Sequence, residues 1–166
     1  MRACLALHLA AAAALLAIPA ARAATAEVQF VHPEKFSDAG KSYQWVDRDT
    51  ALAGLKEHLV KQAAAMLPSD QKLVVNVTDV DLAGWYDPRQ LASRERRIVS
   101  ESHPPRIDLD FRLLAADGSV LKEGQRNLRD YSFLTSGNLG YQNDYLRYEK
   151  TMLDDWLKQE FVKGKR

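Results

Sequence analysis

Residues 106–114 read RIDLDFRLL and alternate between polar and apolar side chains along their whole length. Successive side chains of a β-strand point to opposite faces, so this pattern predicts a strand with one apolar face and one charged face. The apolar face carries Ile107, Leu109, Phe111 and Leu113, and the charged face carries Asp108, Asp110 and Arg112. A sheet built from such a strand is open to water on one side and must be covered by other elements on the other.

Two segments have the three-four spacing of apolar residues that is typical of an amphipathic helix. The first begins after Asp47 or Asp49, either of which can cap it. Its apolar positions are Leu52, Leu55, Leu59, Ala63, Met66 and Leu67. The second covers about 145–164, with Asn143 or Asp144 as its predicted cap. Its apolar positions are Leu146, Leu153, Trp156, Leu157 and Phe161.

Three further segments are rich in β-branched and other apolar residues and predict strands, at 27–31, 72–82 and 120–128. The turn AADGS at 115–119 contains the Asp-Gly pair of a hairpin, so the strands on either side of it are expected to pair antiparallel. The order β-α-β-β-β-α predicts a single α+β domain over 24–166, with a four-stranded mixed or antiparallel sheet and two helices packed on one face. The first β-α-β step allows a parallel crossover.

Residues 1–23, MRACLALHLAAAAALLAIPAARA, have the layout of a cleaved secretory signal peptide. The positive residue Arg2 precedes an apolar run that is too short for a comfortable membrane span, and small residues end the segment at Ala23. We therefore expect cleavage after Ala23, export to a bacterial periplasm and no transmembrane segment in the mature chain. The one cysteine, Cys4, leaves with the signal, so the mature protein has no disulfide.

The mature chain is almost neutral. Removal of Arg2 and Arg22 leaves 21 basic residues against 22 acidic residues, with histidines counted as neutral. Nucleic acids and anionic membranes attract strongly basic surfaces, so the overall charge supports neither as a partner. We expect no binding to nucleic acid.

Residues 76–86, NVTDVDLAGWY, contain a break in the alternation. In strict alternation Asp79 shares a face with Val75 and Val77, whereas Val80 and Leu82 take the opposite face. A bulge or the end of the strand must lie between residues 77 and 80, because an unpaired carboxylate would otherwise enter the core.

The same aspartates form a candidate ligand site. Asp79 and Asp81, with Asp108 and Asp110 on a neighbouring strand, would make an oxygen-rich patch suited to a hard cation such as calcium. The alternative is structural: Asp79 and Asp81 end the strand, and Asp108 and Asp110 are the solvated face of a regular strand. The sequence identifies only Asp79 and Asp81 as weak metal-ligand candidates.

The long, charged connection at 83–104 follows this strand directly. Its candidate binding residues are Trp85, Tyr86, Arg96 and His103, because exposed aromatic residues beside arginines are typical of contact surfaces. The alternative is that the aromatic rings pack over the edge of the sheet while the arginines are solvated. Connections of this length are uncommon unless they are functional or mobile.

Other chemistry has little support in the sequence. His32, His58 and His103 lack metal-ligand spacing, and His58 is expected on the polar side of the first helix. Glu149 and Asp154 are expected to form surface ion pairs with Lys150 and Lys158. No serine-hydrolase, zinc-protease or phosphate-loop motif occurs, and no cofactor is evident.

Five stretches resemble an exported Gram-negative family known as domain of unknown function 3016. They are VQFVHPEKFSD at 28–38, VTDVDLAG at 77–84, PPRIDLDFRL at 104–113, DGSVLKEG at 117–124 and LRYEKTMLDDW at 146–156. They span nearly the whole mature chain in order. The resemblance implies an exported single-domain protein and implies no reaction, because the family has no established activity.

These observations favour an uncharacterised periplasmic accessory or binding module without evident catalytic machinery, whose partner is an envelope protein or a small ligand. The alternative is a metal-binding protein or metal-dependent enzyme that uses the region of Asp79 and Asp81. The two differ in what they require. The first needs a contact surface, and the second needs converging ligands.

Overall fold

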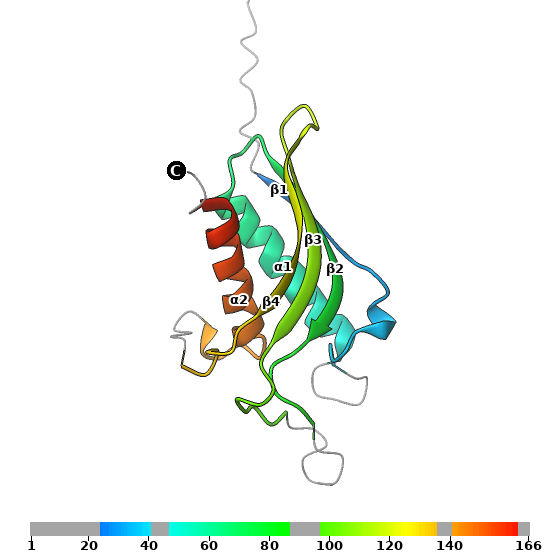
Figure 1. Cartoon of the computed structure of the whole chain (residues 1–166), viewed down its shortest axis with the longest axis vertical. Helices are drawn as coiled ribbons and strands as arrows, with labels where there is room; N and C mark the ends of the chain where they lie inside the picture. Colours follow the sequence, from blue (N-terminus) through cyan, green and yellow to red (C-terminus); the bar gives the residue numbers. More distant parts are fainter. Residues whose placement is uncertain (1–23, 41–46, 87–96, 136–140, 163–166) are drawn as a thin grey trace, which may run out of the picture.

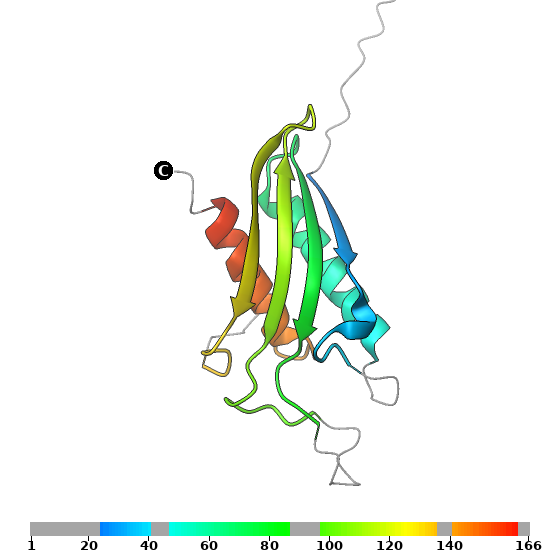
Figure 2. The same cartoon turned by 45° about the vertical axis from the view of Figure 1, so that its right-hand side comes forward.

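The computed structural model describes residues 24–40, 47–86, 97–135 and 141–162, and the predicted signal peptide lies outside them. Two helices lie on one face of a four-stranded sheet, and the described residues leave the other face open (Figures 1 and 2). The elements are, in chain order, β1 (Thr25–Phe30), the 3-10 turn η1 (Pro33–Lys35), α1 (Arg48–Met66), β2 (Lys72–Asp81), β3 (Arg106–Leu114), β4 (Val120–Arg129), α2 (Arg147–Leu157) and the π-helical turn η4 (Lys158–Val162). This order confirms the predicted α+β domain.

The strands lie in the order β1-β2-β3-β4. β1 is parallel to β2 and the other neighbours are antiparallel, so the sheet is mixed and α1 is the crossover between the parallel strands. β2 ends and β3 begins at what we call the lower end of the sheet, and the hairpin between β3 and β4 lies at the upper end (Figure 1). No described helix is long and apolar enough to cross a membrane.

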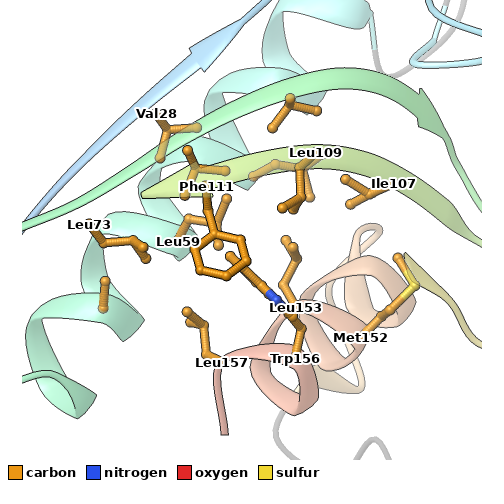
Figure 3. Close-up of a cluster of buried hydrophobic side chains, with 14 of the residues drawn as sticks. Val28, Leu59, Leu73, Ile107, Leu109, Phe111, Met152, Leu153, Trp156 and Leu157 are labelled. Atoms are coloured by element: carbon orange, nitrogen blue, oxygen red, sulfur yellow. The ribbon is translucent and has the colours of Figure 1, made fainter. Parts of the chain in front are cut away.

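The core lies between the sheet and the two helices (Figure 3). Phe111, near the centre of β3, is 1% exposed and packs edge to face against Trp156 and Phe161, with ring centroids 5.7 and 5.4 Å apart. The predicted apolar positions of β3 and α1 are buried, except that Met66 is only partly buried. Each large apolar side chain buried here contributes roughly 1.5–3 kcal/mol, so this layer dominates the stability of the fold.

α1 begins where the sequence predicted, and α2 does not. The Asp47 side chain accepts a hydrogen bond of 2.8 Å from a backbone N–H in the first turn of α1. The residue that precedes α2 is Leu146, so the predicted cap at Asn143 or Asp144 is wrong. The Asp144 carboxylate instead accepts a hydrogen bond of 2.8 Å from the N–H of Leu146, which stabilises the turn before the helix.

A buried polar cluster joins α1 to α2. His58 is 7% exposed, and its Nε2 lies 2.7 Å from Oδ1 of Asp154, whose other oxygen accepts a hydrogen bond of 2.8 Å from the Tyr141 hydroxyl. The predictions that His58 lies on the polar side of the first helix and that Asp154 forms a surface pair with Lys158 are therefore wrong, and Lys158 lies near Asp155 instead. Helical spacing cannot tell that a neighbouring helix covers a polar side chain, which is why sequence reasoning missed the cluster.

β2 contains the irregularity that the break in alternation predicted. Its register against β3 shifts between Val77 and Asp79, which leaves Thr78 as an extra residue. Because the bulge absorbs this residue, Val80 and Leu82 stay on the face that packs against the helices, where both are buried. The prediction of a bulge in this segment is confirmed.

Insertion of one alanine between Asp79 and Val80 is expected to destabilise the protein far more than Thr78→Ala. The inserted residue reverses the alternation that follows the bulge, so Val80 and Leu82 turn to the outer face, and exposing two such side chains costs about 3–6 kcal/mol. Thr78→Ala keeps the bulge and loses one hydrogen bond to the Asp108 carbonyl, worth about 1 kcal/mol. Urea denaturation measures both losses, and equal losses would contradict the role assigned to the bulge.

The buried polar cluster between α1 and α2 predicts that the stability of the protein depends on pH. Burial acts to raise the pKa of Asp154, but hydrogen bonds from His58 and Tyr141 outweigh it and lower that pKa. A lowered folded-state pKa contributes stability that is present above the unfolded pKa, about 4, and is lost as the pH falls through the folded-state value. Asp154→Asn should cost about 1–3 kcal/mol at pH 7 and less at low pH.

The matched control for this experiment is Asp155→Asn on the same helix. The Asp155 side chain is 56% exposed, so its substitution should change the free energy of unfolding by less than about 0.5 kcal/mol. Thermal unfolding between pH 3 and pH 7 measures both variants. A loss in Asp154→Asn that stays constant over this range would contradict the assignment.

Candidate functional site

Asp79 lies at the lower end of the sheet, directly after the bulge, and its carboxylate is fully engaged. It accepts hydrogen bonds from the backbone N–H and the hydroxyl of Ser37, both at 2.7 Å, and from Nη2 of Arg106. One oxygen also accepts from the N–H of Val80 at 2.9 Å. The Asp79 and Arg106 side chains are 19% and 24% exposed, so the pair is partly shielded from water. Asp79 therefore fastens the end of β2 to two other segments.

The segment after β1 is shaped to follow the bulge. The N–H of Val31 donates to the Val77 carbonyl at 2.9 Å, which continues the pairing of β1 with β2. His32 then adopts a left-handed conformation, with φ of 55°, and the chain leaves the sheet through η1. It returns at Asp38, which forms an isolated parallel bridge with Asp81. The detour spans the bulge and brings Ser37 onto Asp79.

The other carboxylates lie on the outer face of the sheet, away from the helices. Asp81 lies 4.0 Å from Nη2 of Arg106, and burial raises the pKa of Asp81 although Arg106 opposes this. Asp108 accepts a hydrogen bond from Asn127, and Asp110 accepts one of 2.8 Å from Asn76. Asp79 and Asp108 are register partners, a like-charge pairing that Arg106 offsets by binding Asp79. The structure thus places all four predicted aspartates on one face, and a cation or an amide partners each.

A shallow hollow of about 340 Å³ lies beside these residues on the outer face. Its polar lining comes from Thr78, Asp108, Asp110, Gln125 and Asn127. Its exposed lining is more polar than apolar. Within the described ranges, no group of three or more His, Cys, Asp or Glu side chains is close enough to hold a metal ion. Because the Asp79 carboxylate already accepts several hydrogen bonds, Asp79 is better suited to a structural role than to binding a metal ion.

The connection after β2 is anchored by Arg97. Its Nε donates to the Ala83 carbonyl at 2.5 Å, and its Nη2 donates to the carbonyls of Leu82 and Gly84 at 2.5 and 3.0 Å. Nη2 also lies 3.1 Å from the carboxylate of Asp38. One guanidinium thus binds three successive carbonyls, which fixes the backbone where β2 ends. We call residues 82–84 the root of the connection.

Beyond the root, Trp85 and His103 come together. The backbone of Trp85 pairs with that of Ile98 through hydrogen bonds of 2.9 and 2.8 Å, and its ring stacks on His103 with centroids 5.7 Å apart. The Tyr86 ring lies 5.2 Å from the guanidinium carbon of Arg97. Trp85 and Tyr86 are half-buried and His103 is exposed. Arg96 lies outside the described residues.

The candidate residues therefore form two neighbouring groups. Asp79 and Asp81 share Arg106, whereas Trp85 and Tyr86 lie beyond the root with His103. Among the described residues, no hydrogen bond or ion pair joins His103 to either aspartate. The hypothesis that Asp79, Asp81 and His103 act together therefore has no direct contact in its support among the described residues.

Sequence reasoning did not identify Ser37, and it favoured Arg96 over Arg97 and a surface position over a buried one for Glu149. Glu149, expected in a surface pair with Lys150, is instead 1% exposed and accepts a hydrogen bond of 2.7 Å from the N–H of Ala83. It lies three residues after Leu146 and four before Leu153, so helical spacing already placed it on the apolar side. No comparable signal distinguishes Arg97 from the other arginines of the connection.

Comparison with known proteins gives a family and no function. The model of the family described as "Protein of unknown function (DUF3016)" matches residues 24–159. No curated protein matches the chain. A solved structure, the dodecamer of a PelC variant from Paraburkholderia phytofirmans, is 11% identical and has a TM-score of 0.37. That match covers 84% of this chain and 88% of the other, and its similarity is too low to carry an inference.

A double-mutant cycle is expected to give a coupling energy between Asp79 and Arg106 of at least about 1.5 kcal/mol, because both are partly buried and hydrogen-bonded. The variants are Asp79→Ala, Arg106→Ala and the double variant, measured by denaturant unfolding. The matched control is the pair of Glu27 and Lys72, whose side chains are 46% and 45% exposed. Its coupling should be clearly smaller, because water screens an exposed pair. Equal coupling energies would contradict a structural role for Asp79.

Proposed function

The chain belongs to the DUF3016 family of proteins of unknown function, and we propose that it is an exported accessory module that binds a protein of the cell envelope. The contact surface comprises Trp85, Tyr86, Val99 and His103 and is called the connection surface below. It lies at the lower end of the sheet, beyond the root. The single observation that carries the proposal is the stacking of Trp85 on His103 over a backbone that Arg97 fixes.

A surface built in this way suits protein recognition. Aromatic rings supply a large contact area with few rotatable bonds, and Trp, Tyr and Arg dominate the energetically important residues of interfaces. Val99 is 37% exposed and follows Ile98, the backbone partner of Trp85. Because the root is already ordered, binding would not require the cost of ordering this backbone. The stacked rings of Trp85 and His103, next to a root that Arg97 holds in place, support the choice of a binding module.

Two further observations support the choice. The signal-like pattern of residues 1–23 supports export, which would place the connection surface in the envelope. The nearly equal numbers of acidic and basic residues favour a protein partner over a nucleic acid. The second candidate, a metal-dependent protein using Asp79 and Asp81, has no specific observation in its favour, because Asp79 is bound by Arg106 and Ser37.

Site-specific photo-crosslinking in living cells tests the proposal. A photoreactive amino acid replaces Val99, or, as the control, Leu121, which is 51% exposed at the upper end of the sheet. We expect a discrete crosslinked adduct from position 99 and none from position 121. Introducing Trp85→Ala should reduce the adduct about tenfold or more, since interface tryptophans commonly contribute 2 kcal/mol or more.

Melting temperatures provide the control for folding in this experiment. Trp85→Ala must melt within a few degrees of the unsubstituted protein for its effect to count as a loss of contact. An adduct from position 99 that persists unchanged in Trp85→Ala would contradict the connection surface. Equal adducts from both positions would show adventitious crosslinking and also contradict it.

A further inference from the structure

Glu149, in the first turn of α2, has an environment that the proposed contact surface does not explain. Its side chain is among the most buried in the protein, and Oε1 accepts the hydrogen bond from Ala83 N–H at 2.7 Å. Oε2 is buried and has no hydrogen-bond partner among the described residues. Placing a carboxyl group there without full satisfaction costs free energy, so its presence needs a reason.

Arg97 holds the same peptide segment from the other side. Glu149 accepts from the N–H of Ala83, and Arg97 donates to the carbonyl of the same residue. Nη1 of Arg97 is also buried without a partner among the described residues. Two ionisable side chains, one from α2 and one from the connection, therefore converge on one residue of the root.

The root packs closely against two other segments of the connection. Gly84 has φ of 83°, a conformation that favours glycine, and a Cβ at this position would lie 2.4 Å from the Ile98 carbonyl oxygen. Its N–H donates to the carbonyl of His103 at 2.9 Å. The backbone of the root is thus in direct contact with Ile98, the backbone partner of Trp85, and with His103.

We propose that Glu149 is a positioning residue, whose carboxyl group locks the root of the connection to helix α2 and thereby sets the stacked pair of Trp85 and His103. This inference rests on the proposed function for its biological consequence, because the pair is part of the proposed contact surface. The positioning itself is a property of the folded chain. It is measurable without the partner.

The protonation of Glu149 offers a direct readout. Burial raises the pKa of Glu149, and Asp144 adds to this, whereas the hydrogen bond from Ala83 and the charge of Arg97 act in the opposite direction. Arg97 is itself paired with Asp38. The charged groups around the Glu149 carboxyl are therefore Asp38, Asp144 and Arg97. Stability from a raised carboxyl pKa is present below the unfolded value and is lost as the pH rises through the folded-state value.

Nuclear magnetic resonance on the full mature chain tests the positioning role. We compare amide hydrogen exchange at Ala83, Gly84 and Trp85 with exchange at Val75, in the middle of β2. Glu149→Ala removes the acceptor for the Ala83 N–H. It should accelerate exchange at the root on the order of tenfold relative to Val75, and it should shift the ring resonances of His103. Glu149→Gln keeps an acceptor oxygen and should restore both.

Leu153→Ala, on the same helix, is the matched control. Leu153 is fully buried in the core, so its truncation should accelerate exchange at Ala83 and Val75 alike through a loss of global stability. If Glu149→Ala behaves in this uniform way, Glu149 is only a stabilising residue and the proposal is overturned. A root that keeps the exchange rates of the unsubstituted protein would overturn it equally.

A pH titration keeps the proposal testable if Glu149→Ala fails to fold. In the unsubstituted protein, the Ala83 amide shift should follow the Glu149 carboxyl carbon, with a midpoint above the usual range for glutamate. In Glu149→Gln that titration should be absent. An Ala83 amide shift that does not change as Glu149 ionises would contradict the proposed positioning role. If these results hold while photo-crosslinking at position 99 fails, the proposed partner site is wrong and the positioning role stands.

Discussion

The extra residue at Thr78 determines how the lower end of this sheet is built. Before Thr78, side chains of β2 alternate regularly between the two faces of the sheet. After it, Val80 and Leu82 would face water unless the strand bulged. The bulge keeps Val80 and Leu82 against the helices and places Asp79 on the outer face. The contacts of Asp79 with Ser37 and Arg106 depend on that change of phase.

A continuous set of contacts leads from the bulge to the connection. Ser37 binds Asp79, and the next residue, Asp38, pairs through its backbone with the end of β2. The Asp38 carboxylate then binds Arg97, which holds the root. The bulge, the charge pairing at the strand end and the anchored root of the connection are therefore parts of one arrangement. A loss at any of its members is expected to be felt by its neighbours.

Charged groups are used here mainly to fix backbone. Arg97 binds three carbonyls, and Glu149 binds one N–H from the opposite side. Buried charges of this kind contribute little net stability compared with apolar packing, because desolvation offsets much of the attraction. Their value lies in selecting one conformation where glycine and a long connection would otherwise allow several.

The sequence predicted the fold well because apolar periodicity decides which faces are buried. The alternation of β3, the apolar face of α1 and the break at Asp79 are all local patterns, and each is present in the structure. Polar residues covered by a distant element carry no such local signal. His58, Asp154 and Arg97 acquire their partners only through tertiary packing. The local sequence pattern therefore could not predict their roles. Glu149 was the exception, because its helical phase already pointed inward.

Cross-strand nuclear Overhauser effects between β2 and β3 test the central claim most directly. The bulge pairs Val80 with Ile107 and Asp81 with Arg106, and it leaves Thr78 without a partner. The account predicts backbone contacts for these two pairs, together with the regular contact between Val77 and Leu109. Contacts of Thr78 with Asp108 and of Val80 with Arg106 as register partners would mean that the ladder continues without a bulge. That result would contradict the account.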